Sequence, residues 1–101
     1  RWTLCFACLL SVVPASAADK PAYNGDIRPI LAENCFACHG PDSAARKADL
    51  RIDRREDAVA AKAINPDRLG ESELLRRIVS TDPDEMMPPP DSHKELQPEQ
   101  K

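Results

Sequence analysis

Large aromatic side chains are scarce in this sequence. Its 101 residues include one Trp, one Tyr and two Phe, with only three Gly, while 31% of the residues are charged. A chain of this length forms one domain at most, and domains this small are marginally stable without additional support. The side chains alone provide too little apolar volume for a large core, so we expect a staple or a cofactor to support the fold.

The sequence also lacks an excess of basic residues. Fourteen Lys and Arg stand against 17 Asp and Glu, which gives a net charge of −3. A protein that binds nucleic acid through its phosphate backbone depends on a basic surface. The composition therefore excludes a nucleic-acid-binding protein of that kind.

A hydrophobic run long enough to cross a membrane securely is missing as well. Residues 2–13 are apolar apart from two hydroxyl side chains, and the small residues 14–18 follow. A span needs about 20 apolar residues, whereas a shorter run ending in an A-x-A site is typical of a secretory signal. We predict a partial signal peptide at residues 1–17, cleaved after Ala17, and an exported domain, periplasmic or on the cell surface, at residues 18–101. If the segment is retained, it would act as a membrane anchor.

Short helices separated by turns are predicted for the rest of the chain. Apolar side chains at helical spacing predict a helix that leads into Cys35. Residues 54–63 predict a second helix, and residues 72–79 predict a third with Ser72 as its N-cap. A further helix is predicted to begin at Gln97 and to be cut off by the end of the chain.

The strongest chemical signal is a C-x-x-C-H motif, Cys35-Phe36-Ala37-Cys38-His39. Two thiols three positions apart on a helical turn can each form a thioether with one haem vinyl group. His39 then lies where an imidazole nitrogen can ligate the iron. Attachment outside the cytoplasm agrees with the predicted signal peptide, so the motif predicts one covalently bound haem c.

Other uses of these side chains are less favoured. A Cys35–Cys38 disulfide is compatible with an oxidising compartment. Zinc requires four ligands, and Cys38 and His39 are adjacent in the chain, which makes joint ligation of one ion difficult. The second C-x-x-C pair, at residues 5–8, lies in the segment that we expect to be removed.

A second axial ligand to the iron must come from another part of the chain, and the candidates are Met86, Met87 and His93. A thioether is a soft ligand suited to haem iron, and it raises the reduction potential. Met87 is favoured over Met86 because it directly precedes the stiff triple-proline segment. His93 lies in a polar stretch and is predicted to be a surface residue.

Several segments of the sequence together resemble the planctomycete-type cytochrome c domain over about residues 22 to 101. The matching segments are Asp26-Ile27-Arg28-Pro29-Ile30-Leu31, the motif Cys35-x-x-Cys38-His39-Gly40-Pro41, Lys47-Ala48-Asp49-Leu50-Arg51, Ser72-Glu73-Leu74-Leu75-Arg76-Arg77-Ile78 and Met87-Pro88-Pro89-Pro90.

This resemblance implies a small all-α fold similar to class I cytochrome c. Three to four short helices would pack around a covalently bound haem, with long Pro-rich loops between them. It also implies that Met87 is the distal ligand, and that the domain lies at the N-terminus of a longer exported protein. The sequence departs from the family pattern at Gln97, where a Ser or Thr cap is usual, and most of the last helix is absent.

The leading hypothesis is an exported c-type cytochrome module that transfers electrons at the haem edge. The iron would be held by His39 and Met87, and the haem by Cys35 and Cys38. The expected partner is a redox protein or the C-terminal domains of the same full-length chain. The alternative is a haem domain that serves a catalytic domain beyond residue 101, and a third option is a peroxidase or gas sensor with an open iron.

Overall fold

The computed structural model describes residues 20–101. The predicted signal peptide and the first C-x-x-C pair lie outside the described residues. Within them the chain is entirely helical and irregular, with no strand, as the all-α prediction required. No helix in this part of the chain has the length and apolar character needed to cross a membrane.

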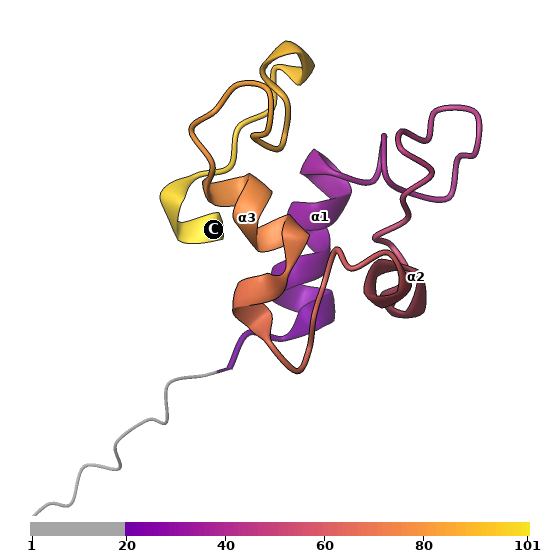
Figure 1. Cartoon of the computed structure of the whole chain (residues 1–101), viewed down its shortest axis with the longest axis vertical. Helices are drawn as coiled ribbons and strands as arrows, with labels where there is room; N and C mark the ends of the chain where they lie inside the picture. The colour runs from indigo at the N-terminus through magenta and orange to yellow at the C-terminus, as the bar shows by residue number, and fades with distance from the viewer. Residues whose placement is uncertain (1–19) are drawn as a thin grey trace, which may run out of the picture.

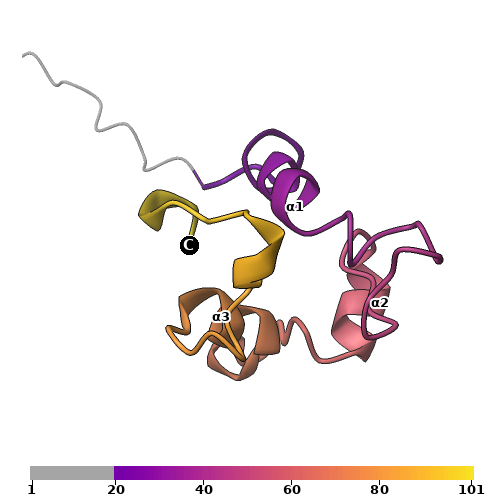
Figure 2. The ribbon, with the colours of Figure 1, turned by 90° about the horizontal axis from the view of Figure 1, so that it is seen from above.

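Three α-helices form the framework. They are α1 (Arg28–Asn34), α2 (Arg55–Ala60) and α3 (Glu73–Val79). Single turns of other helical types flank them, at Tyr23–Ile27, Leu69–Glu71, Pro90–Ser92 and Pro98–Gln100. The helices occupy three corners of the molecule when it is seen from above (Figure 2). The connections between them are long, as expected for a chain with ten prolines (Figure 1).

The first helix forms where the apolar spacing predicted it, with Pro29 in its first turn, where a missing N–H leaves no bond unmade. The second helix is shorter than the predicted 54–63. It ends at Ala60 because the chain turns at Lys62, whose φ of 60° lies in the left-handed region. At the end of the chain, the predicted helix start at Gln97 is present as one 3₁₀ turn, Pro98–Gln100.

Ser72 takes the N-cap position of α3, but its side chain does not cap the helix. Its hydroxyl oxygen instead accepts a hydrogen bond of 2.8 Å from the backbone N–H of Asn65. Ser72 is only 2% exposed. The capping prediction was therefore right about position and wrong about the bond, because a more distant backbone donor occupies the hydroxyl.

The apolar core is small and lies between the three helices. Ile52, Ala58 and Ala63 are buried and form one cluster. Partly buried apolar side chains from each helix and its neighbouring loops pack against this cluster: Leu31, Cys35, Phe36, Leu50, Ile64 and Leu74. In residues 20–101, no large side chain is fully buried. Several of these side chains, Leu50, Ile52 and Leu74 among them, also line a cavity beside the predicted motif.

Candidate functional site

The C-x-x-C-H motif forms a turn that continues α1. The backbone N–H of Cys35 donates to Leu31 O at 2.8 Å, and that of His39 donates to Cys35 O at 2.9 Å. Because residues four apart on a helical turn share a face, Cys35 and His39 point to the same side of α1. Cys38 is half-buried on this turn and is not among the residues that line the cavity.

Gly40 ends the turn at a point where its backbone lies close to the backbone of Phe36. A Cβ atom at this position would overlap the carbonyl oxygen of Phe36. Only a glycine fits there, because the obstacle is backbone and cannot rotate away. Gly40 therefore allows the chain to leave the motif directly after His39.

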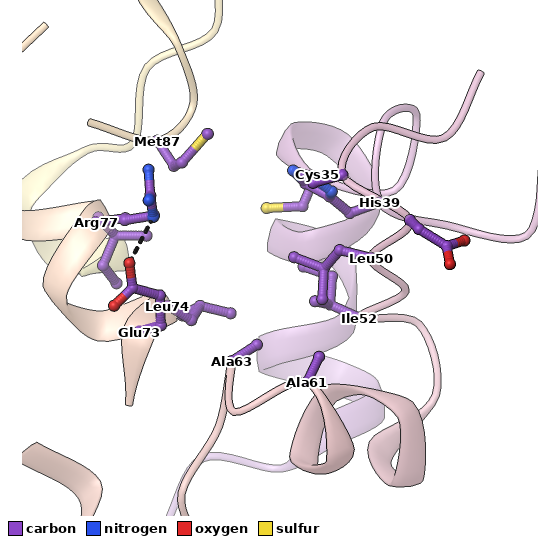
Figure 3. A pocket seen from close by; sticks show the side chains of 13 residues that line it. Cys35, His39, Leu50, Ile52, Ala61, Ala63, Glu73, Leu74, Arg77 and Met87 are labelled. Carbon is purple, nitrogen blue, oxygen red and sulfur yellow. Dashed lines mark hydrogen bonds and ion pairs between the residues drawn. The ribbon is translucent and has the colours of Figure 1, made fainter. Parts of the chain in front are cut away.

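A cavity of about 380 Å³ lies beside this turn, within the range of about 300–1,000 Å³ common for cofactor and small-molecule sites. Cys35 and His39 lie on one wall of it, and Met87 lies on the opposite wall (Figure 3). Most of the lining between them is apolar: Leu50, Ile52, Ala61, Ala63, Leu74 and Ile78. An apolar slot bounded by sulfur and imidazole groups is chemically suited to an apolar macrocycle with a central metal.

The three candidates for the second axial ligand occupy different positions. Met87 lines the cavity, whereas Met86, the residue before it, is half-buried and does not. His93 is exposed, at the end of the turn that follows the prolines. The structure thus brings Met87 to the face opposite His39 and leaves the other two candidates outside the cavity.

His39 carries an unusual buried atom. Its Nδ1 is inaccessible to solvent and has no hydrogen-bond partner. A buried polar group without a partner destabilises a protein by about 1–3 kcal/mol, so such groups are rare and call for an explanation. An imidazole that is kept in an apolar site despite this loss of stability is consistent with a ligand role for the ring.

Burial also affects the Cys35 thiol. Desolvation raises its pKa above the ordinary value, the neighbouring Cys38 raises it further, and the ammonium group of Lys94 acts in the opposite direction. Cys35 and Cys38 are both free thiols, so the disulfide alternative is not what this structure contains. Residues 20–101 also hold no group of three or more His, Cys, Asp or Glu side chains arranged for a metal ion.

Charged residues of α3 form one edge of the cavity. Arg77 donates to the carboxylate of Glu73 at 2.8 Å (Figure 3), and Arg76 donates to both oxygens of that carboxylate at 2.6 and 3.0 Å. These bonds, from Arg76 first and then Arg77, lower the pKa of Glu73 to about 2. Glu73 is therefore an anion at neutral pH, and it fixes the orientation of two arginines.

Two groups of cavity-lining residues were not predicted as site residues from the sequence. Leu50 and Ile52 belong to a stretch of alternating apolar and polar residues that was too short to predict a strand, yet the alternation does place both side chains in the cavity. Glu73 and Arg77 were treated only as part of a helix. Their four-residue spacing was the available signal for an ion pair.

Comparison with known protein families agrees with this geometry. The family described as Planctomycete cytochrome C matches residues 35–91, which is more than half of the chain. The chain belongs to this family. The match begins at the first cysteine of the motif and includes Met87, and it is shorter than the resemblance over residues 22 to 101. Neither the curated proteins nor the solved structures gave a match to the chain.

Membership in the Planctomycete cytochrome C family implies a covalently bound haem c and haem-based electron transfer. The residues present fit this cofactor. Two free thiols stand at the C-x-x-C spacing, and the imidazole and thioether face each other across an apolar cavity. The small core of the chain and its apolar cavity are explained together by a group of this kind.

Proposed function

We propose that this chain is an exported c-type cytochrome module in which Cys35 and Cys38 hold the haem, and His39 and Met87 ligate its iron. The haem supplies reversible one-electron chemistry when bound. The observation that carries the proposal is the placement of His39 and Met87 on opposite walls of one apolar cavity, with Cys35 beside His39 (Figure 3).

The residues of the chain have separate tasks in this proposal. The apolar lining, including Leu50, Ile52 and Leu74, excludes water from the cofactor. A low-dielectric surrounding and a thioether ligand both favour the state of lower charge and so favour a higher reduction potential. If His39 and Met87 both ligate the iron, no position would remain for a substrate, and the chain would act as an electron carrier.

The proposed exchange partner is a redox protein, or further domains of the same full-length chain. Export is supported by the apolar run at residues 2–13 and by the small residues that follow it. It is tested by expressing the chain with its leader in a host that attaches haem c. The proposal expects haem-containing protein outside the cytoplasm whose first residue is Ala18.

The ligand assignment is tested with haem-loaded Met87→Ala and with Met86→Ala as the matched control. Loss of the thioether in Met87→Ala is expected to lower the reduction potential and to let carbon monoxide bind rapidly to the reduced protein. Met86→Ala should retain the wild-type potential and bind carbon monoxide slowly. An unchanged potential in Met87→Ala, or the full effect in Met86→Ala, would contradict the assignment.

A further inference from the structure

Four charged residues connect α3 to the loop that carries Met87. Two are the arginine pair Arg76 and Arg77, of which Arg77 lines the cavity, and the other two are Glu73 and Glu85. The carboxylate of Glu73 holds both guanidinium groups, as described above. Arg76 also donates to the Glu85 carboxylate at 2.8 Å, so the two glutamates are joined through one arginine.

The same arginines bind the main chain of the loop. The guanidinium of Arg77 donates to the carbonyl oxygen of Glu85 at 3.3 Å. The carbonyl oxygen of Arg77 accepts a hydrogen bond of 3.1 Å from the backbone N–H of Met87. Glu85 is thus held at its side chain and at its backbone, and Met87 is held two residues later by its own amide.

Within the described part of the chain, α3 is the only helix that forms hydrogen bonds with residues 83–88. Every hydrogen bond that residues 83–88 make to a helix goes to Arg76 or Arg77. The remaining bonds of this segment are local, such as those from the N–H groups of Glu85 and Met86 to Asp82 O. The position of Met87 relative to the cavity therefore depends on how firmly the arginine pair is held.

Glu73 is the residue that holds the arginine pair. An isolated ion pair at a surface contributes little, because ordering two long side chains opposes the attraction. Here one carboxylate orders two consecutive arginines, so the contacts that those arginines make to Glu85 and Met87 need less additional ordering. The network is consequently more effective than a set of separate pairs.

We infer that Glu73 and Glu85 are positioning residues for Met87, acting through Arg76 and Arg77. The inference rests on the proposed role of Met87 as iron ligand. If the network is weakened, the loop opens more often and Met87 leaves its place against the cavity. A competing ligand binds only the open form, so its apparent affinity rises in proportion to the open fraction.

The test uses haem-loaded, oxidised Glu73→Gln and Glu85→Gln, with imidazole as the competing ligand. Both substitutions keep the shape of the side chain and remove its charge. Glu56→Gln is the matched control, because Glu56 pairs with Arg54 at 2.7 Å and lies away from the cavity lining. Each network variant is expected to bind imidazole about two- to fivefold more tightly than wild type, which is the scale of one exposed ion pair. Glu56→Gln should bind it as wild type does.

A second measurement follows hydrogen exchange at the backbone N–H of Met87, which is bonded to Arg77 O. The inference expects faster exchange at this amide in Glu73→Gln and Glu85→Gln than in Glu56→Gln, with exchange in α1 unchanged. A general loss of stability would instead accelerate exchange in all three helices. If Glu73→Gln does not load haem, Glu85→Gln carries the test, since the Glu85 carboxylate accepts one hydrogen bond, from Arg76, whereas that of Glu73 accepts three.

Met87→Ala distinguishes a failure of the positioning role from a failure of the ligand assignment. If it binds imidazole tightly while the two network variants and Glu56→Gln all match wild type, the positioning role is wrong and the ligand assignment stands. If Met87→Ala binds imidazole no better than wild type, the ligand assignment fails and the inference fails with it. Tighter binding in the network variants, together with faster exchange at Met87 alone, supports both.

Discussion

The backbone N–H of Ile52 donates a hydrogen bond of 2.9 Å to the carbonyl oxygen of His39. A second bond, of 2.7 Å, runs from Lys47 N to Cys38 O, so the loop from Lys47 to Ile52 is bonded to the C-x-x-C-H motif at both ends. This arrangement places Leu50 and Ile52 on the cavity wall, and Ile52 is also part of the buried core. The motif and the apolar wall beside it are therefore one structural unit, and changes in this loop should affect the site.

Ala48→Gly is expected to stabilise the haem-loaded protein by about 1 kcal/mol, because an L-residue with a Cβ is strained in the left-handed region. Ala48 has a φ of 54° and Asp49 after it has a φ of 51°. The measurement is the urea midpoint, compared with that of Ala60→Gly in α2, where the same change should destabilise by about 0.5–1 kcal/mol. Equal shifts of the same sign in the two variants would contradict the explanation.

Gly40→Ala is expected to destabilise the protein by about 1–3 kcal/mol and to lower the yield of haem-loaded chain, because the new methyl group meets the carbonyl of Phe36. The controls are Gly25→Ala and Gly70→Ala, where a Cβ meets nothing within 4 Å. Those two changes should be neutral or slightly stabilising. Haem yield and the urea midpoint measure the effect, and a Gly40→Ala protein that behaves like the controls would show that the turn after His39 tolerates a side chain.

Ser72→Ala should destabilise the protein by about 1–3 kcal/mol. The change leaves the N–H of Asn65 without the partner that it has at 2.8 Å, at a residue that is 2% exposed. Ser80→Ala is the comparison, because Ser80 accepts a bond from Asp82 N at an exposed site, where water can replace it. Thermal or urea unfolding of both variants measures the difference, and similar losses would argue against burial as the cause.

The stabilising effect of Glu73 should depend on pH in a definite direction. Its pKa is lowered from 4.5 to about 2 by Arg76 and Arg77, so the folded state favours the carboxylate. Its contribution is therefore fully present above about pH 4.5 and is lost as the pH falls toward 2. Unfolding of wild type and Glu73→Gln by urea should show a difference in stability at pH 7 that shrinks over this interval. A difference that stays constant down to pH 2 would be inconsistent with the lowered pKa.

Local patterns in the sequence predicted most of the framework. The apolar spacing before Cys35 and in residues 72–79 gave helices at the observed places, since both signals are contained within one helix. The motif predicted a role for Cys35, Cys38 and His39 at one site, and Cys35 and His39 line the cavity. The preference for Met87 over Met86 came from its neighbouring prolines and stays a prediction; of the two, only Met87 lines the cavity.

Features that depend on chain reversal were not predictable from such patterns. The Ser72 hydroxyl does not cap α3 because the loop that contains Asn65 lies against it and Asn65 N–H donates to its oxygen. The contact between Arg76 and Glu85 forms because the chain reverses after α3 and brings together residues nine positions apart. Propensities describe neighbours along the chain, and they contain no information about where a loop returns.

The placement of Cys35 and Met87 on opposite walls of the cavity also joins two distant parts of the chain. With the haem held on both sides as proposed, a group bonded to Cys35 and ligated by Met87 would link segments about 50 residues apart in the folded protein. Oxidation of the Met87 thioether would open that link while the bonds at the cysteines remain, and the chain would then lose stability and its axial ligand in a single event.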